Sequence, residues 1–185
     1  MVATAPDAVT PEPGEAPTPA ATKLGLVATL AVTAGALAVF PARAGDPVDA
    51  RFAAPFLFLF TGLFLLRVAG QLYVRRRRPA WLPPTEQWNL MPYHLLLPSQ
   101  LVIIVVMLWL ALSFAGETGP AGERHGTVGW AVIAFSGVYA GAMAVRYAVR
   151  MARRPEARWF GGTIPIVFHL VLASFLFVVG SFHAS

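Results

Sequence analysis

The 185-residue sequence contains no cysteine. Its absence excludes disulfide bonds, thiolate metal sites, iron–sulfur clusters and a cysteine nucleophile. Charged residues are also scarce: they make up 12% of the chain, about half of the ~25% that is usual in soluble domains. None of the acidic residues lies within the long apolar stretches, so catalysis by paired carboxylates inside those stretches is excluded. Phosphate-binding loops, nucleophile elbows, zinc-protease motifs and kinase signatures are absent too.

Apolar residues dominate what is present. They form 57% of the chain, and the mean hydropathy is +0.63. Four stretches reach the ~20 residues that an α-helix needs to cross ~30 Å of hydrocarbon, and a shorter one precedes them. No alternating pattern of β-barrel strands occurs. We therefore predict an all-α polytopic integral membrane bundle, a single domain over residues 23–185 with spans at 24–41, 52–74, 95–115, 127–148 and 163–182.

The N-terminal region raises two questions. Residues 1–22 are rich in Pro, Ala and Thr without apolar periodicity, which predicts a disordered tail. The first apolar stretch is followed by Ala42-Arg43-Ala44 before Gly45, which has the small-x-small form of a signal-peptidase site. Against cleavage, Lys23 is the only positive charge before this stretch. We expect a retained helix and five spans; cleavage would remove residues 1–44 and leave four.

Loop charge predicts the orientation. Arginines gather at Arg75–Arg78 and between Arg146 and Arg158, whereas the intervening loops hold few basic residues and several acidic ones. The positive-inside rule places both arginine clusters in the cytoplasm, the N-terminus inside and the C-terminus outside. Arginine outnumbers lysine thirteen to one and alanine is abundant, which we interpret as the coding of a high-GC bacterial genome; we therefore expect the protein in a bacterial inner membrane. Because the clusters adjoin apolar spans, the net charge of +5 indicates contact with anionic lipids and not with nucleic acid.

Polar residues within the spans form a candidate ligand site. Counted from the cytoplasmic ends, five of them fall at one depth, roughly 5–14 Å below the inner boundary: Arg67, Gln71, Gln100, Tyr139 and His169. Arg67 has no carboxylate at its depth, so an anionic ligand group is a candidate partner. The alternative is that Arg67 extends to the headgroups while the others bond neighbouring helices or backbone carbonyls.

The histidines offer a second interpretation. His169 and His183 are 14 residues apart, which places them on nearly one helix face about 21 Å apart. This spacing resembles that of membrane-embedded b-type cytochromes, in which paired helices hold two haems. The resemblance implies the pairs His94 with His169 and His125 with His183. The sequence departs from the family because His94 and His125 lie at or in loops. A non-haem metal site would lack a carboxylate within the spans.

Two further patterns concern loops and packing. The segment 78–84, with its Pro-x-Trp-x-Pro-Pro motif, resembles the loop after the first helix of the tryptophan-rich translocator/sensory proteins, which implies binding of porphyrins or sterols. In that family four helices follow the loop, whereas three follow here. Read from its residues alone, the segment is a rigid interfacial loop. Gly137 and Gly141 form a small-residue face on which another helix could approach closely.

Three functions therefore stay open. The first is a non-catalytic membrane protein that binds an apolar ligand such as a lipid, quinone or porphyrin through the inner-leaflet polar residues. The second is a redox protein that holds haem. The third is a structural or accessory subunit of a larger membrane complex or homo-oligomer. No set of catalytic residues is evident.

Overall fold

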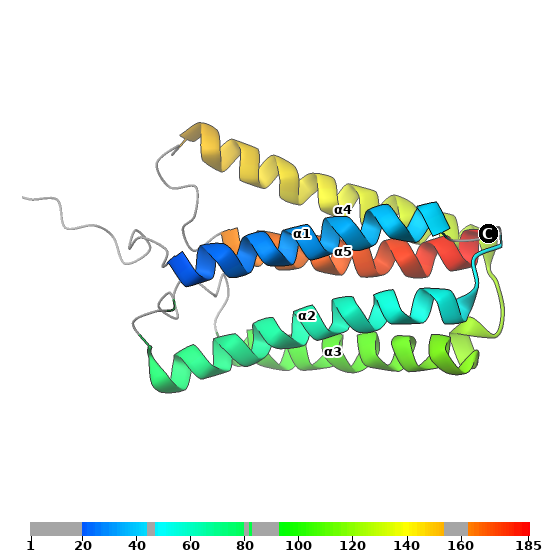
Figure 1. Ribbon diagram of the computed structural model, residues 1–185, viewed down its shortest axis with the longest axis horizontal. Helices are drawn as coiled ribbons and strands as arrows, with labels where there is room; N and C mark the ends of the chain where they lie inside the picture. The colour runs from blue at the N-terminus through cyan, green and yellow to red at the C-terminus, as the bar shows by residue number, and fades with distance from the viewer. Residues whose placement is uncertain (1–19, 44–46, 80–81, 83–92, 154–162) are drawn as a thin grey trace, which may run out of the picture.

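The computed structural model describes residues 20–43, 47–79, 82, 93–153 and 163–185 (Figure 1). These residues form five long α-helices and one short 3-10 helix: α1 (Ala20–Arg43), α2 (Ala50–Arg77), α3 (Tyr93–Gly116), η2 (Gly119–Ala121), α4 (Gly126–Arg153) and α5 (Thr163–Ala184). Each long helix has the length and hydropathy needed to cross a membrane. The predicted all-α membrane bundle is confirmed.

Each predicted span lies inside the corresponding helix, and the helices extend into the flanking polar residues. The start of α2 shows why. Asp49 accepts hydrogen bonds from the backbone N–H groups of Arg51 at 2.7 Å and Phe52 at 3.3 Å, which caps the helix before its apolar part begins. At the other end Arg78 adopts a left-handed conformation, with φ 43°, and its N–H donates to the Val74 carbonyl at 2.9 Å. Hydropathy identifies the part of a helix that lies in the hydrocarbon core of the membrane. It does not identify the capped ends, which lie among polar residues.

Helix α1 is longer than its predicted span at both ends. The helix begins at Ala20, so the last three residues of the predicted disordered tail are helical. It also continues through Pro41 to Arg43, two residues beyond the predicted span. A proline this close to a helix end removes one hydrogen bond without interrupting a longer ladder. The rest of the tail, residues 1–19, and the possible cleavage point after Ala44 lie outside the described residues.

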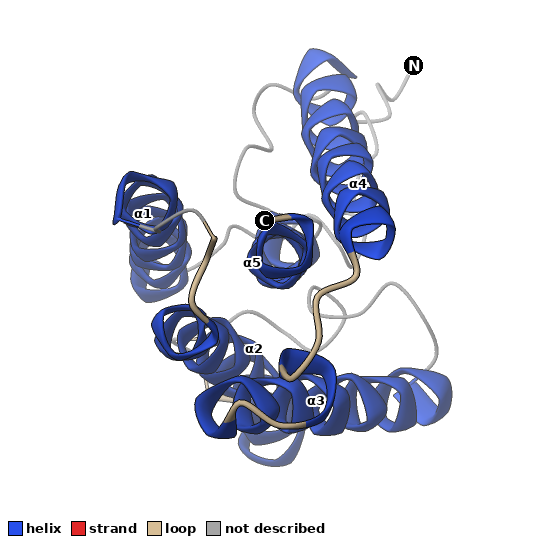
Figure 2. Cartoon of the chain, turned by 90° about the vertical axis from the view of Figure 1, so that its right-hand side faces the viewer, coloured by secondary structure: helices blue, strands red, loops and turns tan. Residues whose placement is uncertain are grey.

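Helix α5 is the centre of the bundle, with α1, α2 and α4 packed around it and α3 packed against α2 (Figure 2). The crossing of α4 and α5 is the closest approach. A Cβ atom added to Gly129 would lie 2.3 Å from the Ala184 nitrogen, and one added to Gly180 would lie 2.9 Å from the Ile133 nitrogen. Only glycine allows two helix backbones to come this near.

Helix α4 also forms one polar contact with α5 and carries two glycines on an open face. The Ser136 hydroxyl donates to the Ala173 carbonyl of α5 at 2.8 Å. In contrast, a Cβ at Gly137 or Gly141 would meet nothing within 4 Å. The face of Gly137 and Gly141, on which another helix could approach, is therefore open within the described residues, because α4 turns Gly129 and Ser136 toward α5.

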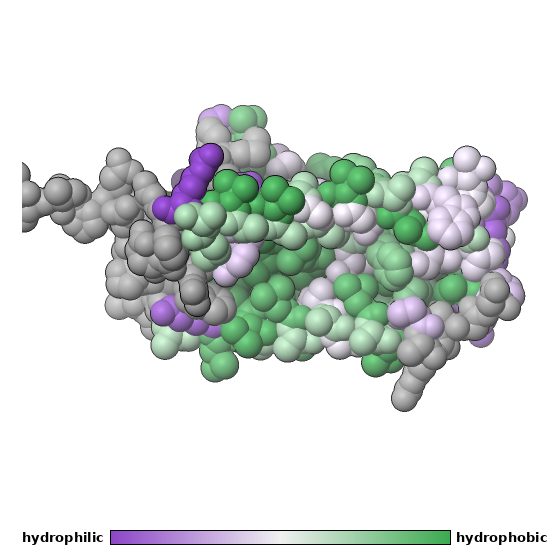
Figure 3. Space-filling view, turned by 90° about the horizontal axis from the view of Figure 1, so that it is seen from above, coloured by the Kyte–Doolittle hydropathy of each residue, from purple (hydrophilic) through white to green (hydrophobic). Residues whose placement is uncertain are grey.

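The surface has the pattern of a membrane protein. Figure 3 shows apolar residues across the middle of the bundle and hydrophilic ones gathered toward its two ends. Large apolar side chains on α3 and α4 are exposed, for example Val105 at 66% and Val138 at 73%. Side chains of this kind are stable when lipid surrounds them. The protein is a multi-pass membrane protein.

Helix α1 belongs to the bundle through one face. Phe40 is buried at 1% exposure, and its ring centroid lies 5.2 Å from that of Phe56 and 6.3 Å from that of Phe177. Aromatic pairs at these distances add to the stabilisation that burial provides. This contact, at the end of α1 next to α2, holds the helix against α2 and α5.

Candidate ligand-binding site

Arg67 turns into the bundle. Arg67 is 6% exposed. Its guanidinium carbon lies 5.9 Å from the ring centroid of Phe64 and 5.6 Å from that of Phe168. Among the described residues its Nε has no hydrogen-bond partner. The ion pair described for this chain joins Arg51 to Glu117 near the opposite end of α2. Arg67 is thus a buried cation packed on aromatic faces, with no carboxylate within any span.

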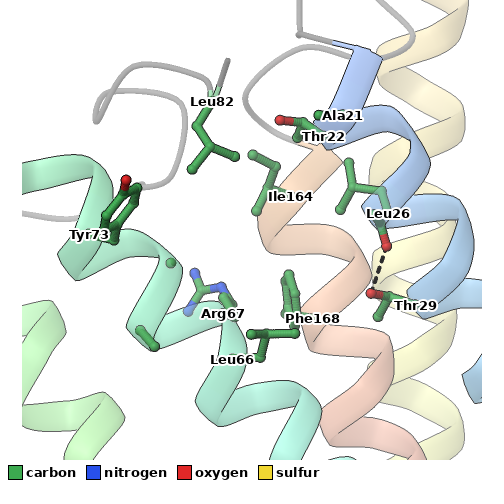
Figure 4. A pocket seen from close by; sticks show the side chains of 13 residues that line it. Ala21, Thr22, Leu26, Thr29, Leu66, Arg67, Tyr73, Leu82, Ile164 and Phe168 are labelled. Carbon is green, nitrogen blue, oxygen red and sulfur yellow. Dashed lines mark hydrogen bonds between the residues drawn. The ribbon is translucent and has the colours of Figure 1, made fainter. Parts of the chain in front are cut away.

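A cavity of about 440 Å³ opens beside Arg67 (Figure 4). This volume lies within the usual range of small-molecule sites. The cavity lies between the first turns of α1, the second half of α2 and the start of α5, with Leu82 at its edge. Its lining is mainly apolar, and the polar members are Arg67, Thr22, Thr29 and Tyr73. A cavity of this composition suits an apolar molecule with a small polar head.

The contribution of α1 to this cavity was not predicted. Thr22 and Thr29 are buried on the face of α1 that lines the cavity. The Thr29 hydroxyl donates to the Gly25 carbonyl at 2.8 Å, whereas the Thr22 hydroxyl has no hydrogen-bond partner among the described residues. The signal in the sequence was a face of threonines in a helix whose other residues are mostly small or aliphatic, with Thr33 as the third buried threonine.

Tyr139 and His169 meet on the α4 side of α5. Their ring centroids are 5.7 Å apart, edge to face. The Nδ1 of His169 is hydrogen-bonded to the Pro165 carbonyl at 2.5 Å. The structure therefore brings Tyr139 of α4 and His169 of α5 into contact, whereas Arg67 of α2 is the one of the five predicted residues that lines the cavity.

The two glutamines are buried but do not line the cavity. Gln71 is 1% exposed and lies one turn from Arg67 on the same face of α2. Gln100 on α3 is 3% exposed, and neither its amide nitrogen nor its amide oxygen has a hydrogen-bond partner among the described residues. Such buried polar groups are unfavourable unless they find a partner. Depth alone grouped these residues with Arg67, but depth does not determine which side of a helix faces the cavity.

The two histidine pairs that the sequence suggested differ in how close their rings lie in the structure. His125 and His183 lie side by side, with ring centroids 5.9 Å apart and planes at 24°. His94 is exposed at the start of α3, and the contacts described for the His169 ring are with α4 and with its own helix. The structure brings the outer pair together and shows no contact within the inner pair. Among the described residues, no group of three or more metal-ligating side chains is close enough to hold a metal ion.

Several expectations fall outside the described residues. Residues 80–81 and 83–92 hold most of the Pro-x-Trp-x-Pro-Pro loop, and residues 154–162 hold the last arginines of the second cluster. Comparison with known proteins adds no assignment, because no family model, curated protein or solved structure matches the chain. The inference of function therefore rests on the geometry of the described helices.

Proposed function

We propose that the protein binds an amphiphile of the surrounding membrane, with a carboxylate, phosphate or carbonyl head at Arg67 and the apolar part in the adjacent cavity. One observation carries the proposal: Arg67 is buried at 6% exposure at the wall of a cavity of about 440 Å³, in spans that contain no acidic residue. Among the described residues no acidic side chain pairs with Arg67, and an unpaired cation within the hydrocarbon region is costly and is usually functional. A ligand that supplies hydrogen-bond acceptors would remove this cost.

The size of the effect decides how to test the proposal. A charge-assisted hydrogen bond contributes about 1.5–3 kcal/mol, which corresponds to roughly ten- to a hundredfold in affinity. Replacing Arg67 by leucine removes that contact, while leucine is favourable in the bilayer. The variant should insert and fold, but retain much less of the bound amphiphile.

The experiment compares Arg67→Leu with Arg51→Leu by mass spectrometry of the lipids and other amphiphiles that co-purify from mild detergent. Arg51 is a matched control because it undergoes the same change on the same helix, lies outside the cavity, and forms an exposed ion pair. Such pairs contribute at most ~1 kcal/mol. The proposal expects one amphiphile class to be depleted in Arg67→Leu and retained in Arg51→Leu. Equal retention in both variants would contradict it.

We further propose that the cavity lies in the inner leaflet of a bacterial inner membrane. Arg75, Arg76 and Arg77 occupy the last turn of α2, at the end nearest the cavity, and the positive-inside rule places that end in the cytoplasm. The N-terminus would then be cytoplasmic and the C-terminus outside. The arginine clusters would contact anionic lipids, which also raises the local concentration of anionic amphiphiles near the cavity.

A second candidate is a haem protein, favoured by the contact between His125 and His183. Neutral imidazoles from two elements are common axial ligands of haem iron. Purified protein would then show a Soret band that His183→Leu abolishes. A preparation without such a band, even after incubation with haem, would remove this candidate.

If neither ligand nor haem binds, the remaining function is a structural subunit, which co-purification of a large membrane partner would reveal.

A further inference from the structure

Helix α1 is anchored at one of its ends. Phe40, the only aromatic residue of α1, is 1% exposed. Its ring centroid lies 5.9 Å from that of Phe52, 5.2 Å from that of Phe56 and 6.3 Å from that of Phe177. Burial and ring contacts with α2 and α5 therefore hold this end of the helix in place.

Residues 20–33 of α1 pack more weakly. Their buried members are Thr22, Leu26, Thr29 and Thr33, among which Leu26 is the only large apolar side chain. The hydroxyls of Thr22 and Thr33 have no hydrogen-bond partner among the described residues, and a buried hydroxyl without a partner is unfavourable. This face therefore stabilises the packed position of α1 less than a face of aliphatic side chains would.

Cavities border this part of α1 on two sides. The cavity beside Arg67 lies between α1, α2 and α5, and a second cavity of about 240 Å³ lies between α1, α4 and α5, with Thr33 in its lining. Figure 4 shows the start of α1 on one side of α5 and Arg67 of α2 on the other. A segment with few buried apolar contacts is the kind that moves most readily in a folded protein.

We propose that residues 20–33 of α1 form a lateral gate, which swings outward about the Phe40 end so that an amphiphile passes between the bilayer and the cavity beside Arg67. This inference rests on the proposed function, because it concerns access to the same site. An amphiphile that exchanges with the bilayer has to pass one wall of the cavity. The walls from α2 and α5 pack closely on other helices, so α1 is the wall that moves at the least cost.

A small tilt is enough to open the gate. Leu24 lies 16 residues before Phe40, which corresponds to about 24 Å of helix. A tilt of about 12°, inside the ~0–40° range of membrane helices, would move Leu24 by about 5 Å. Apolar groups touch at about 4–4.5 Å, so this displacement makes room for one hydrocarbon chain between α1 and α2.

The experiment measures distances between nitroxide labels by double electron–electron resonance in the full-length protein in nanodiscs. The chain has no cysteine, so labels attach only to introduced cysteines. One pair, Leu24→Cys with Leu65→Cys, joins the moving part of α1 to α2, and the other, Val39→Cys with Phe58→Cys, joins the anchored end to α2. All four side chains are exposed, and none lines the cavity beside Arg67.

The first pair should show a second distance component about 5 Å longer than the main one, as expected for the tilt, whereas the second pair should show a single component. A single component of equal width in both pairs would overturn the inference. An equal lengthening in both pairs would overturn it too, because α1 would then leave the bundle as a whole and not swing about Phe40.

A threonine substitution tests the cause of the weak packing. Thr33→Val removes the hydroxyl that has no partner and keeps the shape of the side chain, so it should lower the ratio of the long to the short component about fivefold or more. The matched control is Thr61→Val, since Thr33 and Thr61 are both 5% exposed, but the Thr61 hydroxyl donates to the Leu57 carbonyl at 2.7 Å. The control should leave the ratio unchanged, and equal effects of the two substitutions would overturn the inference.

The link to the ligand is tested separately. A bound amphiphile contacts α1 and Arg67 at once and holds the gate shut, so Arg67→Leu should raise the long component of the first pair while Arg51→Leu leaves it unchanged. If both variants retain the same amphiphiles, the proposed function fails. The wild-type comparison of the two label pairs still decides whether α1 moves, so the two failures can be told apart.

Discussion

Replacing Gly129 by alanine tests the crossing of α4 and α5 on which the architecture depends. The new Cβ would lie 2.3 Å from the Ala184 nitrogen and 2.5 Å from the His183 carbonyl carbon. Both are backbone atoms, so the clash cannot be relieved by a side-chain rotation and one helix must move. Overpacking of this kind costs about 1–3 kcal/mol.

The displacement should also weaken the hydrogen bond between Ser136 and the Ala173 carbonyl, which is 2.8 Å long. Interhelical hydrogen bonds in membranes contribute about 0.6 kcal/mol on average. We therefore expect Gly129→Ala to lower the free energy of unfolding by about 1.5–3.5 kcal/mol in total. Unfolding in mixed micelles by sodium dodecyl sulfate, followed by tryptophan fluorescence, would measure the loss.

The matched control is Gly137→Ala on the same helix. A Cβ at Gly137 meets nothing within 4 Å, and replacing glycine by alanine in a helix interior stabilises it by roughly 0.5–1 kcal/mol. The control should thus be neutral or slightly stabilising. Equal effects of the two substitutions would refute the close crossing and with it the central position of α5.

Three shorter predictions follow from the helix ends and the orientation. A reporter fused after Ser185 should read as periplasmic and one inserted near residue 85 as cytoplasmic, and the reverse result for both would refute the orientation. Intact mass of membrane-extracted protein should show that residues before Gly45 are retained, since Phe40 packs among Phe52, Phe56 and Phe177; a mature start at Gly45 would contradict this. Asp49→Ala should lower the free energy of unfolding by about 0.5–2 kcal/mol, because the cap on two N–H groups of α2 is lost, and an unchanged unfolding midpoint would show that the cap is dispensable.

Hydropathy was enough to locate every long helix, because a continuous apolar stretch of sufficient length has few alternatives to a spanning helix. Hydropathy could not predict how each helix is rotated about its own axis. Ser136 and Gly137 are neighbours in the sequence, yet the first is buried against α5 and the second is open. Rotation is set by contacts between helices, which a single sequence does not display when almost every face is apolar.

The candidate site was also predicted only in part, because the sequence gives the depth of a residue but not the direction in which it faces. Depth counted along the spans placed Arg67, Tyr139 and His169 at one level. The structure brings Tyr139 and His169 into ring contact because α4 packs on α5, and it places Arg67 at the wall of the cavity. The same count included Gln71 and Gln100, which do not line the cavity, and it missed Thr22 of α1, which does. For α1 the sequence analysis considered only whether the segment spans the membrane and whether it is cleaved. That α1 forms a wall of the cavity follows from its packing in the structure.

The most direct test of the central claim is an experimental structure of the full-length protein crystallised from a lipidic mesophase. The account predicts elongated density in the cavity between α1, α2 and α5, with its polar end in hydrogen-bonding contact with the Arg67 guanidinium. A structure in which Arg67 instead extends to the membrane surface, or in which α1 closes the cavity against α2, would contradict it.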